Sequence, residues 1–312
     1  MRRFLTIQLV IFLLFTVRVS GQQMPQYSQL PFHQFSLNPA LAGINTCVDM
    51  RILYRQQWIG VPQAPSGGFF TLSARVGGKK RKYMGAYHGV GLKFEREAFG
   101  PFAHNRLQFA YALHIPLKKE LTLSMGAYAG IDNMTFDASR VTSIDPDPAV
   151  QTSSFSFLGP DASFGTWLTG KHFFVGATLQ NLIPLDYPIG YEASKRIHFY
   201  LNGGGQIKLN DAGLSLLPVA TFRFPPTGPI GIDFHALLDF RNTFTFGVGY
   251  RKQESVLFLA RVKFLGYFTV AYSFDLITNK LKGGMGHTHE LSIGITTCKK
   301  KSTQSDVCPV FE

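Results

Sequence analysis

Long hydrophobic runs are missing from most of this chain. After residue 21, no stretch reaches eighteen consecutive apolar residues, whereas a helix needs about twenty to cross the roughly 30 Å hydrocarbon core of a membrane. Charged residues are also scarce, at 16% against roughly 25% in soluble domains. An apolar, exported chain without a spanning helix has one common way to sit in a membrane, the closed β-barrel.

The first segment has the order of a secretory signal. Arg2 and Arg3 precede an apolar run of about fourteen residues, which is short for a membrane anchor, and the segment closes on Ser20 and Gly21. We predict that residues 1–21 are a signal peptide that is cleaved before Gln22. The formal charge is +12, and removing the three Arg of the signal leaves a mature chain that is still basic. A basic balance often indicates nucleic-acid binding, but export argues against that class.

From Cys47 to Thr297 the side chains alternate between apolar and polar types, with a period of two. Ile52 and Tyr54, for example, alternate with Arg51 and Arg55. Successive side chains of a strand point to opposite faces, and segments of nine to eleven residues suit a tilted spanning strand. We predict fourteen strands, at about residues 47–56, 68–77, 87–96, 105–115, 121–131, 161–169, 172–181, 195–208, 213–224, 229–240, 243–251, 254–265, 267–275 and 287–297.

The predicted connections alternate in length. Those after the fourth, sixth, eighth, tenth and twelfth strands are tight, and most of the others are longer, which is typical of the two sides of an outer-membrane barrel. The connections after the second and eleventh strands do not fit this scheme. We therefore expect an all-β, transmembrane antiparallel β-barrel of about fourteen strands, with both termini in the periplasm. The expected segments are the signal (1–21), a periplasmic or plug-like segment (22–46), the barrel (47–297) and a periplasmic tail (298–312).

The parity of each strand predicts which side chains face lipid and which face the lumen. Aromatic residues near strand ends should form a girdle at the membrane interface: Tyr54, Trp58, Tyr87, Phe173, Tyr250 and Phe274. Charged residues and three histidines should face the lumen and form a crosslinked interior: Asp49, Arg51, Arg55, Arg75, Lys93, Glu95, Asp233, Asp239, Arg261, Lys263, His114, His198 and His235.

Several motifs occur in a fixed order along the chain. QMPQYSQ (23–29) is followed by NPALAG (38–43), YRQQW (54–58), the turn Ala64-Pro65, DPDPAV near residue 145, FLGPDASFG near 160, HFFVGATLQNL and GHTHELSIGI. This ordered set resembles the PorP/SprF family of outer-membrane proteins from Bacteroidota, over nearly the whole mature chain. The tail KKKSTQSDVCPVFE departs from that resemblance.

The resemblance implies a non-catalytic outer-membrane component of type IX protein secretion, or of the related gliding motility machinery. Its implied partners are periplasmic ring subunits, lipoproteins and a peptidoglycan-binding subunit, besides outer-membrane lipid. It implies no cofactor, no nucleic acid and no small-molecule substrate. The alternative is a passive porin or solute channel, and a crosslinked lumen argues against an open pore.

The family motifs supply the first candidate site residues. In the NPALAG motif these are Asn38, Pro39, Ala40, Ala42 and Gly43, which form either a partner-binding loop or, as we favour, a turn that leads into the barrel. The end of the first strand contributes Tyr54, Arg55, Gln57 and Trp58.

Basic clusters are the second candidate. In the predicted topology they lie on the periplasmic side, where they would attract an acidic partner, peptidoglycan or anionic lipid, unless they are ordinary solvated turns. The clusters are Lys79, Lys80, Arg81 and Lys82, then Lys118 and Lys119, then Lys299, Lys300 and Lys301.

The three cysteines and a few polar groups leave alternatives open. Cys47 could pair with Cys298 or with Cys308 across neighbouring strand ends, and a Cys298–Cys308 bridge within the tail is the competitor. His287, His289 and Glu290 could form part of a metal site, but no further ligand has an informative spacing. The Asp145–Pro148 stretch is a calcium site or, as we favour, a turn.

Overall fold

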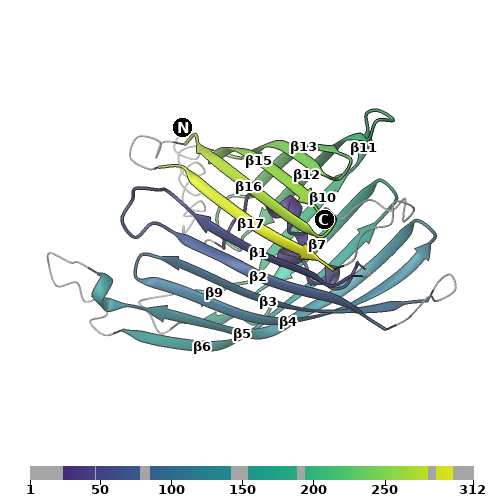
Figure 1. Ribbon diagram of the computed structural model, residues 1–312. Helices are drawn as coiled ribbons and strands as arrows, with labels where there is room; N and C mark the ends of the chain where they lie inside the picture. The colour runs from purple at the N-terminus through teal and green to yellow at the C-terminus, as the bar shows by residue number, and fades with distance from the viewer. Residues whose placement is uncertain are drawn as a thin grey trace, which may run out of the picture.

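Fourteen antiparallel strands form the wall of one closed barrel (Figure 1). The computed structural model describes residues 24–45, 47–77, 85–141, 154–187, 194–279 and 286–297. The wall strands are β1 (Asp49–Gln56), β2 (Ser66–Val76), β3 (Tyr87–Phe99), β4 (Phe102–Lys118), β5 (Leu121–Phe136), β6 (Phe155–Thr169), β7 (Phe173–Gln180), β10 (His198–Gly205), β12 (Leu214–Phe224), β13 (Gly231–Phe240), β14 (Phe244–Arg251), β15 (Ser255–Phe264), β16 (Phe268–Ile277) and β17 (Thr288–Thr296).

The barrel closes where the first wall strand pairs with the last. β1 pairs with both β2 and β17, and β10 pairs with both β7 and β12. Three two-residue strands lie outside this ring: β8 (Leu185–Asp186), β9 (Ser194–Lys195) and β11 (Ile207–Lys208). The predicted antiparallel barrel of about fourteen strands is confirmed. The predicted eighth strand (195–208) is shorter than expected, because β9 and β11 are separate from β10.

The two ends of the barrel are named here by the seam between β1 and β17. The proximal end is where β1 begins and β17 ends, on the right in Figure 1, and the distal end is the opposite one. Because neighbouring wall strands are antiparallel, the connections β2–β3 and β4–β5 lie at the proximal end, and β1–β2 and β3–β4 lie at the distal end.

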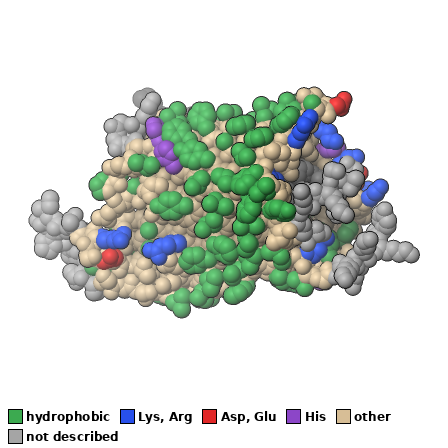
Figure 2. Space-filling model, in the orientation of Figure 1, with side chains coloured by type: hydrophobic (Ala, Val, Ile, Leu, Met, Phe, Trp, Pro, Cys, Tyr) green, Lys and Arg blue, Asp and Glu red, His purple; other side chains and the backbone are tan. Residues whose placement is uncertain are grey.

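The alternation in the sequence becomes an apolar outer surface and a polar interior. Ile52 and Tyr54 are 53% and 57% exposed, whereas Arg51 and Arg55 are 5% and 4% exposed. Figure 2 shows hydrophobic side chains spread across the outer face of the barrel. No helix among the residues that the structure describes is long and apolar enough to span a membrane.

One predicted girdle residue faces the other way. The ring of Tyr87 stacks on that of His114 with centroids 4.5 Å apart, and the guanidinium carbon of Arg75 lies 3.8 Å from its centroid. Since His114 is fully buried inside the barrel, Tyr87 belongs to the lumen, and its assignment to the interfacial girdle is wrong. The parity of β3 decides this, because Lys93 and Glu95 share it and are buried as well.

Strands β3 to β6 extend further at the distal end than the alternation predicted. Their distal ends carry lumen-facing phenylalanines that pack across neighbouring strands: Phe99 on Phe102, Phe102 on Phe136 and Phe136 on Phe155, with centroids 5.2–5.5 Å apart. Such cross-strand aromatic pairs stabilise a sheet. The connection after the third strand, predicted to be long, is therefore reduced to Gly100 and Pro101.

Residues 24–45 fold inside the barrel rather than in front of it. They form three short helices, η1 (Leu30–Phe32), α2 (Gln34–Leu37) and η2 (Pro39–Leu41), and most of their side chains are buried by the wall. We call this segment the plug. Its first residues lie near the distal ends of β16 and β17, and Gly43 lies beside β2 and β3 at the proximal end. The plug therefore runs the length of the lumen before the chain enters β1.

Candidate functional site

At the distal end, two polar residues of the plug are bound by four buried ionic side chains from four wall strands. We call this group the plug clamp. It comprises Ser28 and Gln29 of the plug and Arg55, Arg251, Asp275 and Glu290 of the wall. Both plug residues are fully buried. Buried charges are tolerated only when they are paired and hydrogen-bonded, so the contacts of each member decide how firmly the plug is held.

Glu290 is the centre of the plug clamp. Its two carboxylate oxygens accept hydrogen bonds from the backbone N–H groups of Ser28 and Gln29, at 2.7 and 2.9 Å. The same carboxylate forms an ion pair with the guanidinium of Arg55. The amide of Gln29 donates to the carbonyl oxygen of Glu290 at 3.1 Å and accepts from the hydroxyl of Ser292 at 2.6 Å. Two consecutive backbone donors of the plug are thus satisfied by one wall side chain.

The hydroxyl of Ser28 joins the rest of the plug clamp. It donates to Asp275 at 2.7 Å and accepts from the guanidinium groups of Arg55, at 3.2 Å, and Arg251, at 3.3 Å. Arg251 also pairs with Asp233, which forms a two-pronged pair with Arg223. The plug is therefore connected to six wall strands by one continuous network, in which each charge has an opposite partner.

A second buried ion cluster secures the segment between β7 and β10. The ammonium group of Lys195 lies 3.0 Å from Asp132 and 2.5 Å from Asp161. Arg106 contacts both of these aspartates and also Glu95. These pairs agree with the crosslinked interior that the sequence predicted.

The NPALAG motif forms the proximal half of the plug. Asn38 caps η2, because its side-chain oxygen accepts from the N–H of Ala40 at 3.0 Å. Its amide nitrogen donates to the carbonyl oxygens of Thr166, at 3.0 Å, and Ala177, at 3.3 Å, on β6 and β7. The motif is therefore an anchor inside the lumen, with Asn38, Ala40 and Ala42 fully buried. Of the two interpretations left open, this burial favours the structural one.

Glycines on the lumen face of the wall make room for this motif. A Cβ at Gly126 of β5 would lie 2.6 Å from the carbonyl oxygen of Pro39, a Cβ at Gly165 of β6 would overlap the side chain of Asn38, and a Cβ at Gly89 of β3 would overlap the carbonyl oxygen of Ala42. Because the plug backbone lies against the wall backbone, only glycine fits at these positions.

A buried histidine lies between the two halves of the plug. His33 is 5% exposed, and its ring lies edge-on to Phe69 with centroids 5.5 Å apart. Burial, reinforced by the nearby Arg51 and Arg261, lowers the pKa of His33 well below its usual value. The folded protein thus holds His33 neutral.

Because His33 is buried in its neutral form, we expect the folded barrel to lose stability in acid. The folded pKa of His33 lies below the unfolded value of about 6.5, so the unfolded chain binds the proton more readily. The contribution of His33 to the free energy of unfolding is therefore fully present above that pH. It is lost as the pH falls from there towards the folded pKa. We expect His33→Phe, which keeps the packing on Phe69, to remove this loss. Unfolding in denaturant at pH 7.5 and 5 measures it, and equal acid losses in both proteins would contradict it.

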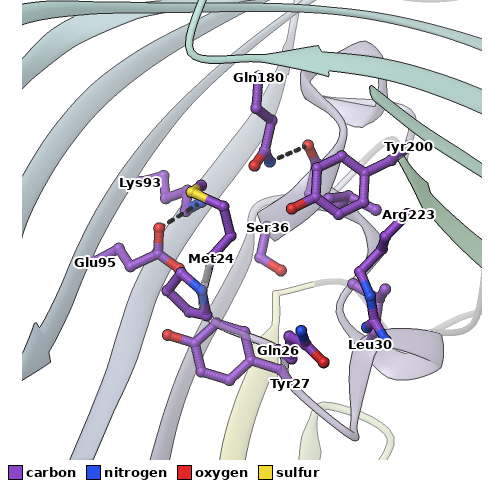
Figure 3. Close-up of a pocket in the computed structure, with 12 residues that line it drawn as sticks. Met24, Gln26, Tyr27, Leu30, Ser36, Lys93, Glu95, Gln180, Tyr200 and Arg223 are labelled. Atoms are coloured by element: carbon purple, nitrogen blue, oxygen red, sulfur yellow. Dashed lines mark hydrogen bonds and ion pairs between the residues drawn. The ribbon is translucent and has the colours of Figure 1, made fainter. Parts of the chain in front are cut away.

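A small pocket remains beside the plug (Figure 3). Lys93 and Glu95 of β3 line it as an ion pair 3.0 Å apart, and Gln180 of β7 donates to the carbonyl oxygen of Leu37 at 3.2 Å. Other polar side chains also line it: Gln26, Tyr27, Ser36, Tyr200 and Arg223. A small pocket with several polar partners suits ordered water.

The remaining predicted site residues do not gather at one place. Tyr54 points outward, and its hydroxyl donates to Gln56 at 2.9 Å, whereas Arg55 belongs to the plug clamp. Gln57 and Trp58 begin the distal β1–β2 connection, where Trp58 adopts φ 47°. Lys118 and Lys119 are exposed at the proximal end. Several predicted residues lie outside the described part: Lys79, Lys80, Arg81, Lys82, Asp145–Pro148, Cys298, Lys299, Lys300, Lys301 and Cys308.

The suggested metal ligands point in different directions. His289 is on the outer face, where its ring nitrogen and the hydroxyl of Tyr272 lie 2.6 Å apart, whereas Glu290 points into the lumen. Within the described ranges, no group of three His, Cys, Asp or Glu side chains could hold a metal ion.

The plug clamp joins motifs that the sequence showed only as separate segments. Ser28 and Gln29 belong to QMPQYSQ, Arg55 to YRQQW and Glu290 to GHTHELSIGI. No local pattern in the sequence marks Ser28, Arg251 or Asp275 as site residues. Their parity places the two wall residues in the lumen, but the pairing between residues more than two hundred positions apart is visible only in the folded barrel.

Comparisons with solved structures agree with the fold. The toluene transporter TbuX of Ralstonia pickettii is 10% identical, with a TM-score of 0.52 over 91% of this chain and 97% of that chain. A FadL homologue of Pseudomonas aeruginosa is 12% identical, with a TM-score of 0.50 over 88% and 95%. CymD, described as a monoaromatic hydrocarbon channel, is 11% identical, with a TM-score of 0.51 over 89% and 94%. At such identities the likeness concerns the fold alone.

Sequence comparison is more specific. No curated protein sequence is significantly similar to the chain. The family model for the type IX secretion system membrane protein PorP/SprF, however, matches residues 19–295. This range includes the whole plug and all fourteen wall strands apart from Thr296, the last residue of β17. The chain therefore belongs to the PorP/SprF family of type IX secretion system membrane proteins.

Proposed function

We propose that this chain is a closed, non-catalytic outer-membrane component of the type IX secretion machinery, or of its gliding-type relative, which binds periplasmic partners through its proximal end. The observation that carries the proposal is the plug. A segment that fills the lumen and is bonded to the wall at both ends leaves a scaffold rather than a channel. The partners we propose are ring subunits, lipoproteins and a peptidoglycan-associated subunit.

The charges at the two ends support the proximal end as the partner-binding one. Described proximal turns carry Lys118, Lys119, Lys171, Lys208 and Arg241 against two acids, Glu120 and Asp211. The described distal end is balanced, since Arg96, Arg140, Arg196 and Lys252 are matched by Glu97, Asp137, Asp186 and Glu254. Several Lys and Arg side chains are visible at the right end of the face in Figure 2. A basic end attracts acidic protein surfaces and anionic polymers.

β2 ends and β3 begins at the proximal end, and the sequence between them includes Lys79, Lys80, Arg81 and Lys82. We expect charge reversal of these four residues to reduce co-purification of periplasmic partners from crosslinked envelopes at least several-fold, while the barrel still folds. The matched control reverses four distal charges, Arg96, Arg140, Arg196 and Lys252, and should retain the partners. Equal recovery with both variants would remove the basic end from the proposal.

A passive channel is the second candidate, because solved barrels of this fold are described as hydrocarbon channels and transporters. The plug provides a test between the two functions. If the chain is a scaffold, the purified barrel should show no large steady conductance in planar bilayers. If it is a porin, such a conductance should be present.

A further inference from the structure

The distal part of β6 has a partner strand on one side only. β5 pairs with β6 along its whole length, whereas β7 pairs with it only from Phe164 to Thr169. One bond extends the second contact, since the N–H of Leu182 donates to the carbonyl oxygen of Ala162 at 2.8 Å. Within the part of the chain that the structure describes, no strand pairs with residues 155–161 on the side away from β5. We call this stretch the free edge; it lies at the distal end of the longest wall strands, β4 to β6 (Figure 1).

The segment that follows β7 covers the lumen face of β6 and not its edge. A Cβ at Gly159 would lie 2.4 Å from a methyl carbon of Leu185, and the rings of Phe157 and Tyr187 pack edge-on with centroids 5.7 Å apart. β8 and β9 pair with each other rather than with β6. An apolar, partly aromatic inner face therefore lies beside the free edge.

The backbone groups that point away from β5 are those of the even-numbered residues of β6. The bond from Leu182 to the carbonyl oxygen of Ala162 fixes this parity, because successive residues of an antiparallel strand direct their N–H and C=O groups to opposite sides. Pro160 agrees with it, since proline has no N–H and is tolerated in a sheet where that group has no ladder partner. The free edge thus presents the N–H and C=O groups of Ser156 and Leu158 and the C=O group of Pro160.

The free edge lies at the distal limit of the apolar outer surface. The last large outward apolar side chains of β3, β4 and β5 are followed, two positions further towards the distal end, by polar ones: Arg96, Asn105 and Asn133. Arg96 donates to Asn105 at 3.0 Å, and the hydroxyl of Ser156 donates to Asn133 at 2.8 Å. Unpaired backbone groups are not tolerated in hydrocarbon. The polar row places the N–H groups of Ser156 and Leu158 at and beyond that boundary, where a partner can reach them from the distal side.

A second copy of the chain does not fit this edge. Two copies in one membrane are related by a rotation about the membrane normal, and barrel strands are tilted by about 35–45° from that normal. Two β6 edges that face each other would therefore cross at about 70–90°, whereas neighbouring strands of a sheet differ by only about 20–25°. An extended segment of a different polypeptide has no such restriction.

We propose that the free edge of β6 binds an extended segment of another polypeptide, which adds to the wall as a strand on the distal side of the membrane. The backbone of that segment bonds to Ser156 and Leu158. Its inward side chains lie against Phe157 and Tyr187, so apolar residues at every second position are favoured. The site is at the opposite end from the basic proximal turns, and it is independent of the partners proposed there.

Hydrogen exchange of the purified, folded barrel, resolved to single amides, tests this edge. The N–H groups of Ser156 and Leu158 should exchange about ten-fold faster than those of Phe157 and Gly159, which point to β5. A synthetic peptide of alternating valine and threonine, added at millimolar concentration, should slow the two exposed amides. The same peptide, N-methylated at every residue, should not. Equal protection of all four amides without peptide, or no slowing by the unmethylated peptide, would overturn the proposal.

A proline substitution separates the backbone edge from the side chains around it. Leu158→Pro should abolish the slowing at Ser156 while the barrel still folds, because it removes an N–H that points away from β5, as Pro160 already does. Leu158→Ala is the matched control, since it keeps the N–H, and it should retain the slowing. Folding of both variants is checked by the heat-dependent mobility shift in semi-native electrophoresis.

Two results would contradict the assignment. If the slowing at Ser156 persists in Leu158→Pro, or is lost in Leu158→Ala, the backbone edge does not bind the peptide. If the purified wild-type protein is a dimer that Leu158→Pro dissociates, the edge belongs to a second copy of the chain and not to another polypeptide.

Discussion

Replacement of Glu290 by Ala is expected to destabilise the folded barrel by about 3–5 kcal/mol, the range typical of a buried ion pair that loses one partner. Glu290 is 1% exposed and binds Arg55 together with two backbone N–H groups of the plug. Without it, a buried guanidinium loses its nearest anion, and the N–H groups of Ser28 and Gln29 lose their acceptor. The loss should therefore exceed that of an ordinary surface substitution several-fold.

The control for this variant comes from the same network. Glu254 contacts Arg251 at 3.3 Å, but its side chain is 38% exposed, so water can replace it. We expect Glu254→Ala to cost less than about 1 kcal/mol. Unfolding of the purified, refolded barrels in denaturant compares the two, and similar losses would show that the plug clamp is not an energetic centre of the fold.

Gly89→Leu is expected to convert the closed barrel into a conducting one. Any Cβ at this position would overlap the carbonyl oxygen of Ala42, and the backbone on each side is held by the ladders of β2 and β4. The proximal half of the plug must therefore move away from the wall. Overpacking of this kind costs about 1–3 kcal/mol, and the displaced segment should leave a steady conductance in planar bilayers.

Gly203→Leu is the matched control. Gly203 lies on β10 at a position that faces outward, and a Cβ there would come no closer than 3.3 Å to the carbonyl oxygen of Phe174. A leucine on the lipid-facing surface should leave the barrel closed and as stable as the wild-type protein. If the Gly89 variant also stays closed, with unchanged stability, the glycines do not determine the position of the plug.

Glu290→Ala and Gly89→Leu both test the plug, the part of the structure that was hardest to predict from the sequence. The wall could be predicted because the side chains of each strand alternate between apolar types that face lipid and polar types that face the lumen. In β13, for instance, Phe234 and Leu238 alternate with Asp233 and Asp239, and their exposed and buried classes follow that order. Tyr87 shows the limit of the method, since an aromatic residue near a strand end suits an interfacial girdle and a lumen stack equally well.

The plug residues show no such alternation. Ser28 and Gln29 are ordinary polar residues of a loop-like segment, and only the wall around them makes each a buried, fully bonded group. The same holds for NPALAG, whose turn chemistry was evident while its place inside the barrel was not. The direction of the plug, from the distal to the proximal end, was likewise beyond any local pattern.

By itself, the sequence determined the closed antiparallel barrel, its strand order and the family to which the chain belongs. These depend on the two-residue period of side-chain direction and on motifs that are local in the chain. The tertiary structure alone decided how residues 24–45 fill the lumen and that Glu290 meets Ser28 and Gln29. Each of these depends on register between segments far apart in the chain, which is set by closure of the ring and not by any neighbouring residues.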